Sequence, residues 1–119
     1  MSLITIKNML DWVEENIKRN PTLDEMSNFV GYSPFYCSAK FHEHVGMTFK
    51  QYLAQRRLSL ATEEVKNSRR KLVDIAMDYG YSSPEVFTRA FVKAYGCTPF
   101  QYRKELPKLI LFQKPLVHE

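Results

Sequence analysis

Residues 23–52 read LDEMSNFVGYSPFYCSAKFHEHVGMTFKQY, and residues 72–102 read LVDIAMDYGYSSPEVFTRAFVKAYGCTPFQY. The two stretches share one pattern, in which the second copy carries one extra residue at its Ser82-Ser83 pair. Most of the shared positions hold turn, cap or core residue types, which predicts a duplicated helix-turn-helix unit. The shared pairs are Leu23/Leu72, Gly31/Gly80, Tyr32/Tyr81, Ser33/Ser82, Pro34/Pro84, Phe41/Phe91, Gly46/Gly96, Thr48/Thr98, Gln51/Gln101 and Tyr52/Tyr102.

The helix start and stop signals along the chain predict an all-α fold of seven helices. Ser or Thr residues stand at helix-start positions and glycines at helix-end positions, and Pro107 bars the last helix from continuing. With their caps, the expected helices cover about residues 5–18, 22–30, 33–46, 48–67, 73–79, 83–96 and 98–106.

The expected domain organisation follows from these helix start and stop signals. We expect one DNA-binding domain over residues 1–107. It consists of a first helix-turn-helix subdomain (6–47), a linker helix (48–67) and a second subdomain (68–106). A helix of about 19 residues is about 29 Å long, close to the roughly 34 Å between adjacent major grooves on one face of DNA. The tail, residues 108–119, is expected either to pack on the helices or to link to an effector domain that this chain lacks.

The composition limits the classes of function. The chain has 119 residues, 45% of them hydrophobic, which is enough for one small domain or two very small ones sharing a helix. No apolar run approaches the length of a membrane span, so we expect no membrane partner. The formal net charge of +4 allows a polyanionic partner. Cys37 and Cys97 show no disulfide or Cys-x-x-Cys pattern, which suits a reducing cytoplasm.

No catalytic or metal-binding constellation is evident in the sequence. Cys37, His42 and His44 fit no zinc-ligand spacing, so we expect no metal and no cofactor. The sequence also lacks a nucleophile–base pair and a phosphate-binding loop, and we do not expect an enzyme.

The third expected helix has one core face and one outer face, because each residue turns about 100° around a helix. Cys37, Phe41 and Val45 share the expected core face. His42 and Glu43 lie on the opposite face, with the residues that we expect to contact DNA bases. These residues are Phe35, Tyr36, Ser38 and Ala39.

The sixth expected helix presents a stronger candidate for base reading. Its core face carries Phe87, Phe91 and Tyr95. Arg89, on the other face, can donate two hydrogen bonds to guanine O6 and N7, whereas a surface ion pair with Glu85 is the structural alternative. The base contacts expected from this helix are Glu85, Val86, Thr88 and Arg89.

Contacts to DNA phosphates require positive charge or free backbone N–H groups at helix starts. A run of charged residues is often only a solvent-exposed face, so we expect only some of the candidates to contact DNA. The candidates are Ser33, Lys40, Lys50, Arg70, Lys71, Ser83, Lys93, Thr98 and Arg103.

These motifs together resemble the DNA-binding domain of the AraC/XylS family of transcription regulators, over about residues 6–103. The first copy contributes Gly31-Tyr32-Ser33-Pro34, and the linker contributes Arg57 and Ala61. The second copy matches more strongly, through Ile75-Ala76, Gly80-Tyr81-Ser82-Ser83, Phe87, Arg89, Phe91, Gly96, Thr98-Pro99 and Tyr102-Arg103.

The resemblance implies seven helices, a cytoplasmic location, binding to double-stranded DNA and activation of transcription, commonly through contacts to RNA polymerase. In some members a ligand-sensing domain follows, so a small-molecule effector could act through a domain absent here. Members of one branch carry Arg where this chain has Ala39, and a bulky aromatic residue where it has Phe35. Without that Arg, the resemblance does not by itself imply sequence-specific recognition by the third expected helix. The alternative function is a helical protein-interaction or RNA-binding module without DNA sequence specificity.

Overall fold

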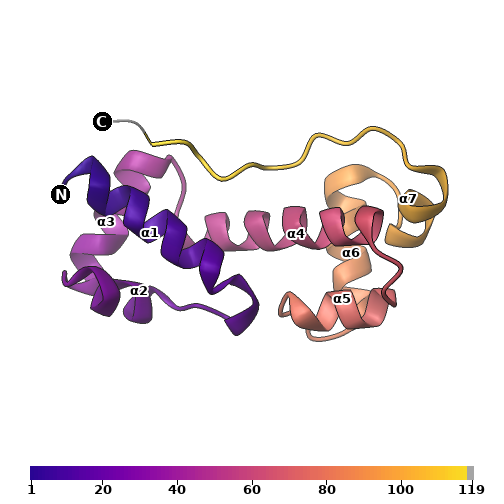
Figure 1. Cartoon of the computed structure of the whole chain (residues 1–119), viewed down its shortest axis with the longest axis horizontal. Coiled ribbons are helices and arrows are strands. Elements are labelled where there is room, and N and C mark those ends of the chain that lie inside the picture. The colour runs from indigo at the N-terminus through magenta and orange to yellow at the C-terminus, as the bar shows by residue number, and fades with distance from the viewer. Residues whose placement is uncertain (118–119) are drawn as a thin grey trace. The chain divides into compact units, whose positions relative to one another are not determined.

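The computed structural model describes residues 1–117, and every regular element within them is a helix (Figure 1). The predicted all-α fold of seven helices is confirmed, with one short 3-10 helix, η1, in addition. The elements are α1 (Leu3–Glu15), η1 (Ile17–Arg19), α2 (Leu23–Val30), α3 (Pro34–Val45), α4 (Phe49–Asn67), α5 (Leu72–Asp78), α6 (Pro84–Tyr95) and α7 (Pro99–Glu105). None of these helices is long and apolar enough to cross a membrane.

The chain divides into two compact units. The first consists of residues 1–55 and the end of the tail from Gln113, and the second of residues 56–112. The helix α4 contributes its first turns to one unit and its remainder to the other. Each unit therefore contains one copy of the repeat with its own core.

The first unit is built around the aromatic ring of Phe41 in α3. The ring packs edge-on against Phe49 and Tyr52, with centroids 5.7 Å and 5.5 Å away. All three side chains are buried, and α1, in the same unit, buries an apolar stripe at helical spacing. That stripe consists of Ile6, Met9, Leu10 and Val13.

The second unit repeats this arrangement around Phe91 in α6. Its ring lies 5.7 Å from Tyr102 and 5.9 Å from Phe87, all three being buried. Val65 of α4 and Ile75 of α5 are fully buried in the same unit. The pairs Phe41/Tyr52 and Phe91/Tyr102 thus have the same role in the two copies.

The helix caps form as the sequence predicts. Thr22 and Thr98 close capping boxes with Glu25 and Gln101, and Ser33 and Ser83 cap α3 and α6. Thr48 and Gln51 exchange the reciprocal hydrogen bonds of a third box at the start of α4. The glycines Gly31, Gly46, Gly80 and Gly96 all have positive φ, so a side chain at these helix ends would be strained.

Three details differ from expectation. The first helix begins at Leu3, because Ser2 accepts a hydrogen bond from the Thr5 amide, and its last predicted turn is the separate 3-10 helix η1. The fifth helix begins at Leu72 without a side-chain cap. Val45 and Tyr95 are half-buried rather than buried, because each is the last residue of its helix.

The tail has no regular secondary structure up to residue 117, yet parts of it are held by the helices. In the second unit, the Arg56 guanidinium, which is buried, donates a hydrogen bond to the Phe112 carbonyl at 2.7 Å. In the first unit, Lys114 forms an ion pair with Asp11 of α1. Ile110, by contrast, is 93% exposed. These contacts fit the expectation that the tail packs on the helices. The alternative, a linker to a further domain, remains a prediction.

Candidate nucleic-acid interface

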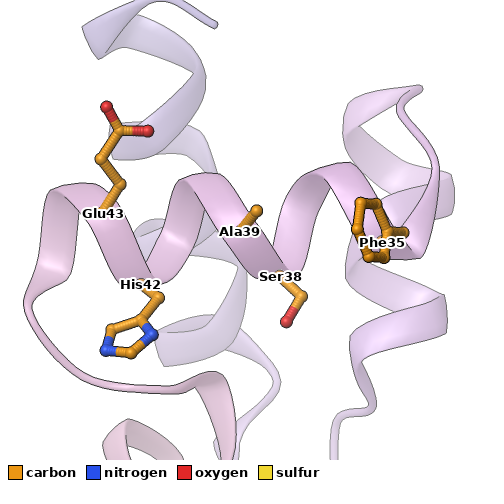
Figure 2. Close-up of a pocket in the computed structure, with 5 residues that line it drawn as sticks. All are labelled: Phe35, Ser38, Ala39, His42 and Glu43. Atoms are coloured by element: carbon orange, nitrogen blue, oxygen red, sulfur yellow. The ribbon is translucent and has the colours of Figure 1, made fainter.

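The outer face of α3 contains a shallow hollow of about 580 Å³. It is lined by Phe35, Ser38, Ala39, His42 and Glu43, which lie along one side of the helix (Figure 2). Phe35 stands at the N-terminal end and is 87% exposed. An aromatic ring so exposed at a helix start is costly in water, which favours a surface that is covered when a partner binds.

The structure brings together three of the four residues expected to contact bases from α3, and places the fourth elsewhere. Tyr36 does not line the hollow; its ring packs beside Tyr32, with centroids 5.3 Å apart. Its hydroxyl accepts a hydrogen bond from the Met1 amine at 3.2 Å. A base contact by Tyr36 stays a prediction, but this packing favours a supporting role for its ring.

The charge on α3 is largely internally compensated. Lys40 donates to the Glu43 carboxylate at 3.1 Å, and its ammonium also lies 5.7 Å from the Tyr36 ring centroid. This hydrogen bond raises the pKa of Lys40 and lowers the pKa of Glu43. Lys40 is therefore charged but already paired, and a phosphate would have to compete with Glu43 for it.

The outer face of α6 differs from that of α3 because it carries an uncompensated cation. Arg89 is exposed in the second turn, and no hydrogen bond or ion pair engages its guanidinium among residues 1–117. Glu85, one turn earlier, is also exposed and does not pair with it. The expected alternative of a surface Glu85–Arg89 pair is thus absent from the described part of the chain. Val86 and Thr88 are half-buried beside them.

The phosphate candidates fall into two groups. Lys50, Lys71 and Lys93 are exposed and form no ion pair with any described residue. The helix starts at Ser33, Ser83 and Thr98 present backbone N–H groups, although each hydroxyl already caps its own helix. These residues fit the predicted phosphate contacts, which remain predictions.

Arg70 and Arg103 are engaged within the protein. Arg70 forms ion pairs with Glu64 at 2.9 Å and Asp78 at 2.7 Å, and these carboxylates raise its pKa. Arg103 donates through Nε to the Val65 carbonyl at 3.0 Å, and its Nη2 is buried. Both arginines therefore tie α4 to neighbouring parts of the second unit, so a phosphate contact would have to displace or supplement these bonds.

The turn between α5 and α6 is closely packed against α4 within the second unit. A Cβ at Gly80 would lie 3.4 Å from Cζ of Arg57, and the φ of Gly80 is +83°. Burial lowers the pKa of Arg57 and raises the pKa of Tyr81 to about 12. This packing holds the turn that leads into α6 against α4.

Comparison with known proteins decides the family. A family model described as a helix-turn-helix domain matches residues 26–105. The regulatory protein SoxS of Salmonella typhimurium is 36% identical over 101 residues, covering 85% of this chain and 94% of SoxS. This chain belongs to the AraC family of helix-turn-helix DNA-binding transcription regulators.

Other AraC-family proteins agree with this assignment. The multiple antibiotic resistance protein MarA of the same species is 30% identical over 100 residues, covering 84% of this chain and 79% of MarA. The crystal structure of an AraC-type regulator from Chromobacterium violaceum has a TM-score of 0.78 and 22% identity, and covers 85% of this chain and 90% of that one. At that identity the structural similarity shows the shared fold.

Two residues of the α3 surface were not among the expected base contacts. His42 and Glu43 line the same hollow as Ala39 because they follow it by one turn on the same face of the helix. Helical periodicity alone places them there. Lys40 and Glu43 are three residues apart, so the same periodicity allows the ion pair that the structure forms between them.

Proposed function

We propose that this AraC-family chain activates transcription by binding duplex DNA as a single chain, with α3 and α6 each reading one box in the major groove. The expected base contacts are those named above for the two helices, and the exposed lysines and helix starts would hold the phosphates. Two readers in one chain remove the need for a dimer to supply the second half-site.

The observation that carries this proposal is the state of Arg89. Its guanidinium is exposed on α6 and unengaged by the described residues, although Glu85 lies one turn away. Arginine is the side chain that most often reads guanine, because its planar fork matches O6 and N7. An exposed arginine with no partner among residues 1–117, on the outer face of this helix, is suited to that contact.

The wider setting is part of the same proposal. A regulator that reads bacterial DNA acts in the cytoplasm, and an activator needs a contact with RNA polymerase. Effector control would come from a domain outside this chain. The spacing of about 10 base pairs between box centres, expected from the length of the linker helix, also belongs to the proposal.

Selection of bound duplexes from a random pool tests the proposal. We expect enrichment of one sequence with two unlike boxes, bound at least about 10³-fold more tightly than random DNA. Equal binding to all duplexes, or stronger binding to single-stranded or folded RNA, would instead support a module without DNA sequence specificity.

A further inference from the structure

The two outer faces are chemically unlike, although the helices that carry them are copies of one unit. The hollow on α3 is formed by the Phe35 ring and the Ala39 methyl group, with Ser38, His42 and Glu43 around them. Neither an arginine nor a lysine lines it. On α6, the corresponding face carries Arg89 and Glu85, both exposed.

This difference determines which base edges each face can recognise. Guanine is distinguished in the major groove by a pair of acceptors, which calls for a forked or ammonium donor. The lining of the α3 hollow has neither, and Lys40, the nearest cation along the helix, is paired with Glu43. Arg89 on α6 has the required fork and no competing partner among residues 1–117.

The apolar feature of the major groove is the C5-methyl group of thymine. A thymine methyl is the one base group that gains from contact with Phe35 and Ala39, because burying it removes apolar surface from water on both sides. Ser38 and His42 can hydrogen-bond to more than one base, so they add contact without selecting guanine.

From these contrasts we infer that the DNA target is chemically divided: α3 selects thymine through its methyl group, and α6 selects guanine through N7 and O6. This inference rests on the proposed function and specifies its DNA substrate. The first box should therefore be rich in A·T pairs, and the second should contain an essential G·C pair.

Base analogues test the inference on the enriched duplex. Replacing each thymine in turn by deoxyuridine removes only the methyl group, and replacing each guanine by 7-deazaguanine removes only the N7 acceptor. We expect at least one thymine in the first box whose demethylation weakens binding about fourfold, the loss of one buried methyl group. We expect one guanine in the second box whose N7 removal weakens binding at least about tenfold, as for a charged hydrogen bond.

Two variants assign these effects to their side chains. In Phe35→Ala the deoxyuridine effect should disappear while the 7-deazaguanine effect stays, and in Arg89→Ala the reverse should hold. Ile110→Ala, which alters an equally exposed apolar side chain in the tail, and Arg19→Ala, which removes one exposed charge, should leave both effects unchanged. Circular dichroism confirms that each variant is folded.

The outcomes separate the inference from the proposed function. If no sequence is enriched, the proposed function fails and the inference fails with it. If a sequence is enriched but no thymine methyl matters, or if the thymine effect persists in Phe35→Ala, the inference is overturned while sequence-specific binding stands. A guanine effect that depends on Phe35 rather than Arg89 would likewise overturn it.

Discussion

The ammonium nitrogen of Lys40 lies 3.1 Å from a carboxylate oxygen of Glu43 on the outer face of α3. This pair compensates charge on a surface that is proposed to approach DNA phosphates. The recognition helix of the first unit therefore gains less from long-range attraction to DNA than its composition suggests. The pair gives the first prediction.

Glu43→Gln should strengthen binding to every duplex, because it removes a negative charge from the interface and releases Lys40 for a phosphate. The plot of log affinity against log salt should become steeper by about one unit, the effect of one additional phosphate contact. Fluorescence anisotropy over a range of salt concentrations measures both quantities. Glu15→Gln makes the same charge change at an exposed position of α1 and should leave the slope unchanged; equal slopes for the two variants would contradict the pairing argument.

Arg89→Ala should weaken binding to the best site by about 1–3 kcal/mol and relax the preference at one base pair. Binding to random DNA should change little, because the contact is to a base. Competition assays on single-base variants of the site measure this. Arg89→Lys retains the charge but not the fork, and should recover only part of the discrimination. An equal loss on specific and random DNA would make Arg89 a phosphate contact instead.

Arg70 and Lys71 provide a matched pair in one basic run. Lys71 is exposed and unpaired among the described residues, whereas Arg70 is bound to Glu64 and Asp78. Lys71→Ala should weaken all duplex binding and flatten the salt dependence without changing the urea midpoint of unfolding. Arg70→Ala should weaken all duplexes as well and also lower that midpoint. A change in affinity without any change in stability for Arg70→Ala would show that its ion pairs contribute nothing to the fold.

The contacts of the tail predict the effect of removing it. Truncation after Leu106 deletes the Phe112 carbonyl that accepts from buried Arg56, and the ion pair of Lys114 with Asp11. We expect the free energy of unfolding to fall by about 1–3 kcal/mol, the cost of removing a hydrogen bond from a buried charged donor. Ile110→Ala, at an exposed position, should have little effect. Unchanged stability after truncation would mean that the tail is only a linker.

The ion pair of the tail also has a pH signature. The Lys114 ammonium, followed by that of Lys7, lowers the pKa of Asp11 below its ordinary value of 3.8. A carboxyl group whose pKa is lower in the folded state stabilises the fold above its unfolded pKa, and this contribution is lost as the pH falls through the folded value. Lys114→Gln should therefore be less stable than the wild type at neutral pH, and the difference should shrink below about pH 4.

Urea titrations at several pH values measure this difference. Lys108→Gln, an exposed and unpaired tail lysine within the described chain, serves as the control and should show a small difference that does not follow Asp11. A Lys114→Gln difference that is the same at pH 3 and pH 7 would contradict an ion pair with Asp11.

The sequence was sufficient for most of the fold because local signals and core periodicity agree. Two helix starts are predicted by capping-box residues three positions apart, Thr22 with Glu25 and Thr98 with Gln101. The structure forms both capping boxes. Phe41 and Phe91 occupy equivalent places in the repeat, and each lies at the centre of its unit. Short-range patterns of this kind depend only on local helix geometry, so they can be predicted from the sequence.

The partners of the long polar side chains could not be predicted in this way. The sequence predicts phosphate contacts for Arg70 and Arg103, but it does not indicate that Arg70 binds two carboxylates and Arg103 a backbone carbonyl. Their partners lie between 6 and 38 residues away along the chain. Helical periodicity gives the face of a residue, but such pairings depend on how separate helices pack. Phe35 and Arg89, whose faces alone matter, were placed correctly on the surface.

The most direct test of the central claim is a hydroxyl-radical footprint on the enriched duplex, combined with the mass of the complex in solution. The account predicts one chain per duplex and two protected boxes of unlike sequence, with centres about 10 base pairs apart. Arg89→Ala should lose protection of one box before the other as protein concentration falls. Two chains bound obligately to an inverted repeat, each protecting one identical half-site, would contradict the claim that a single chain carries both readers.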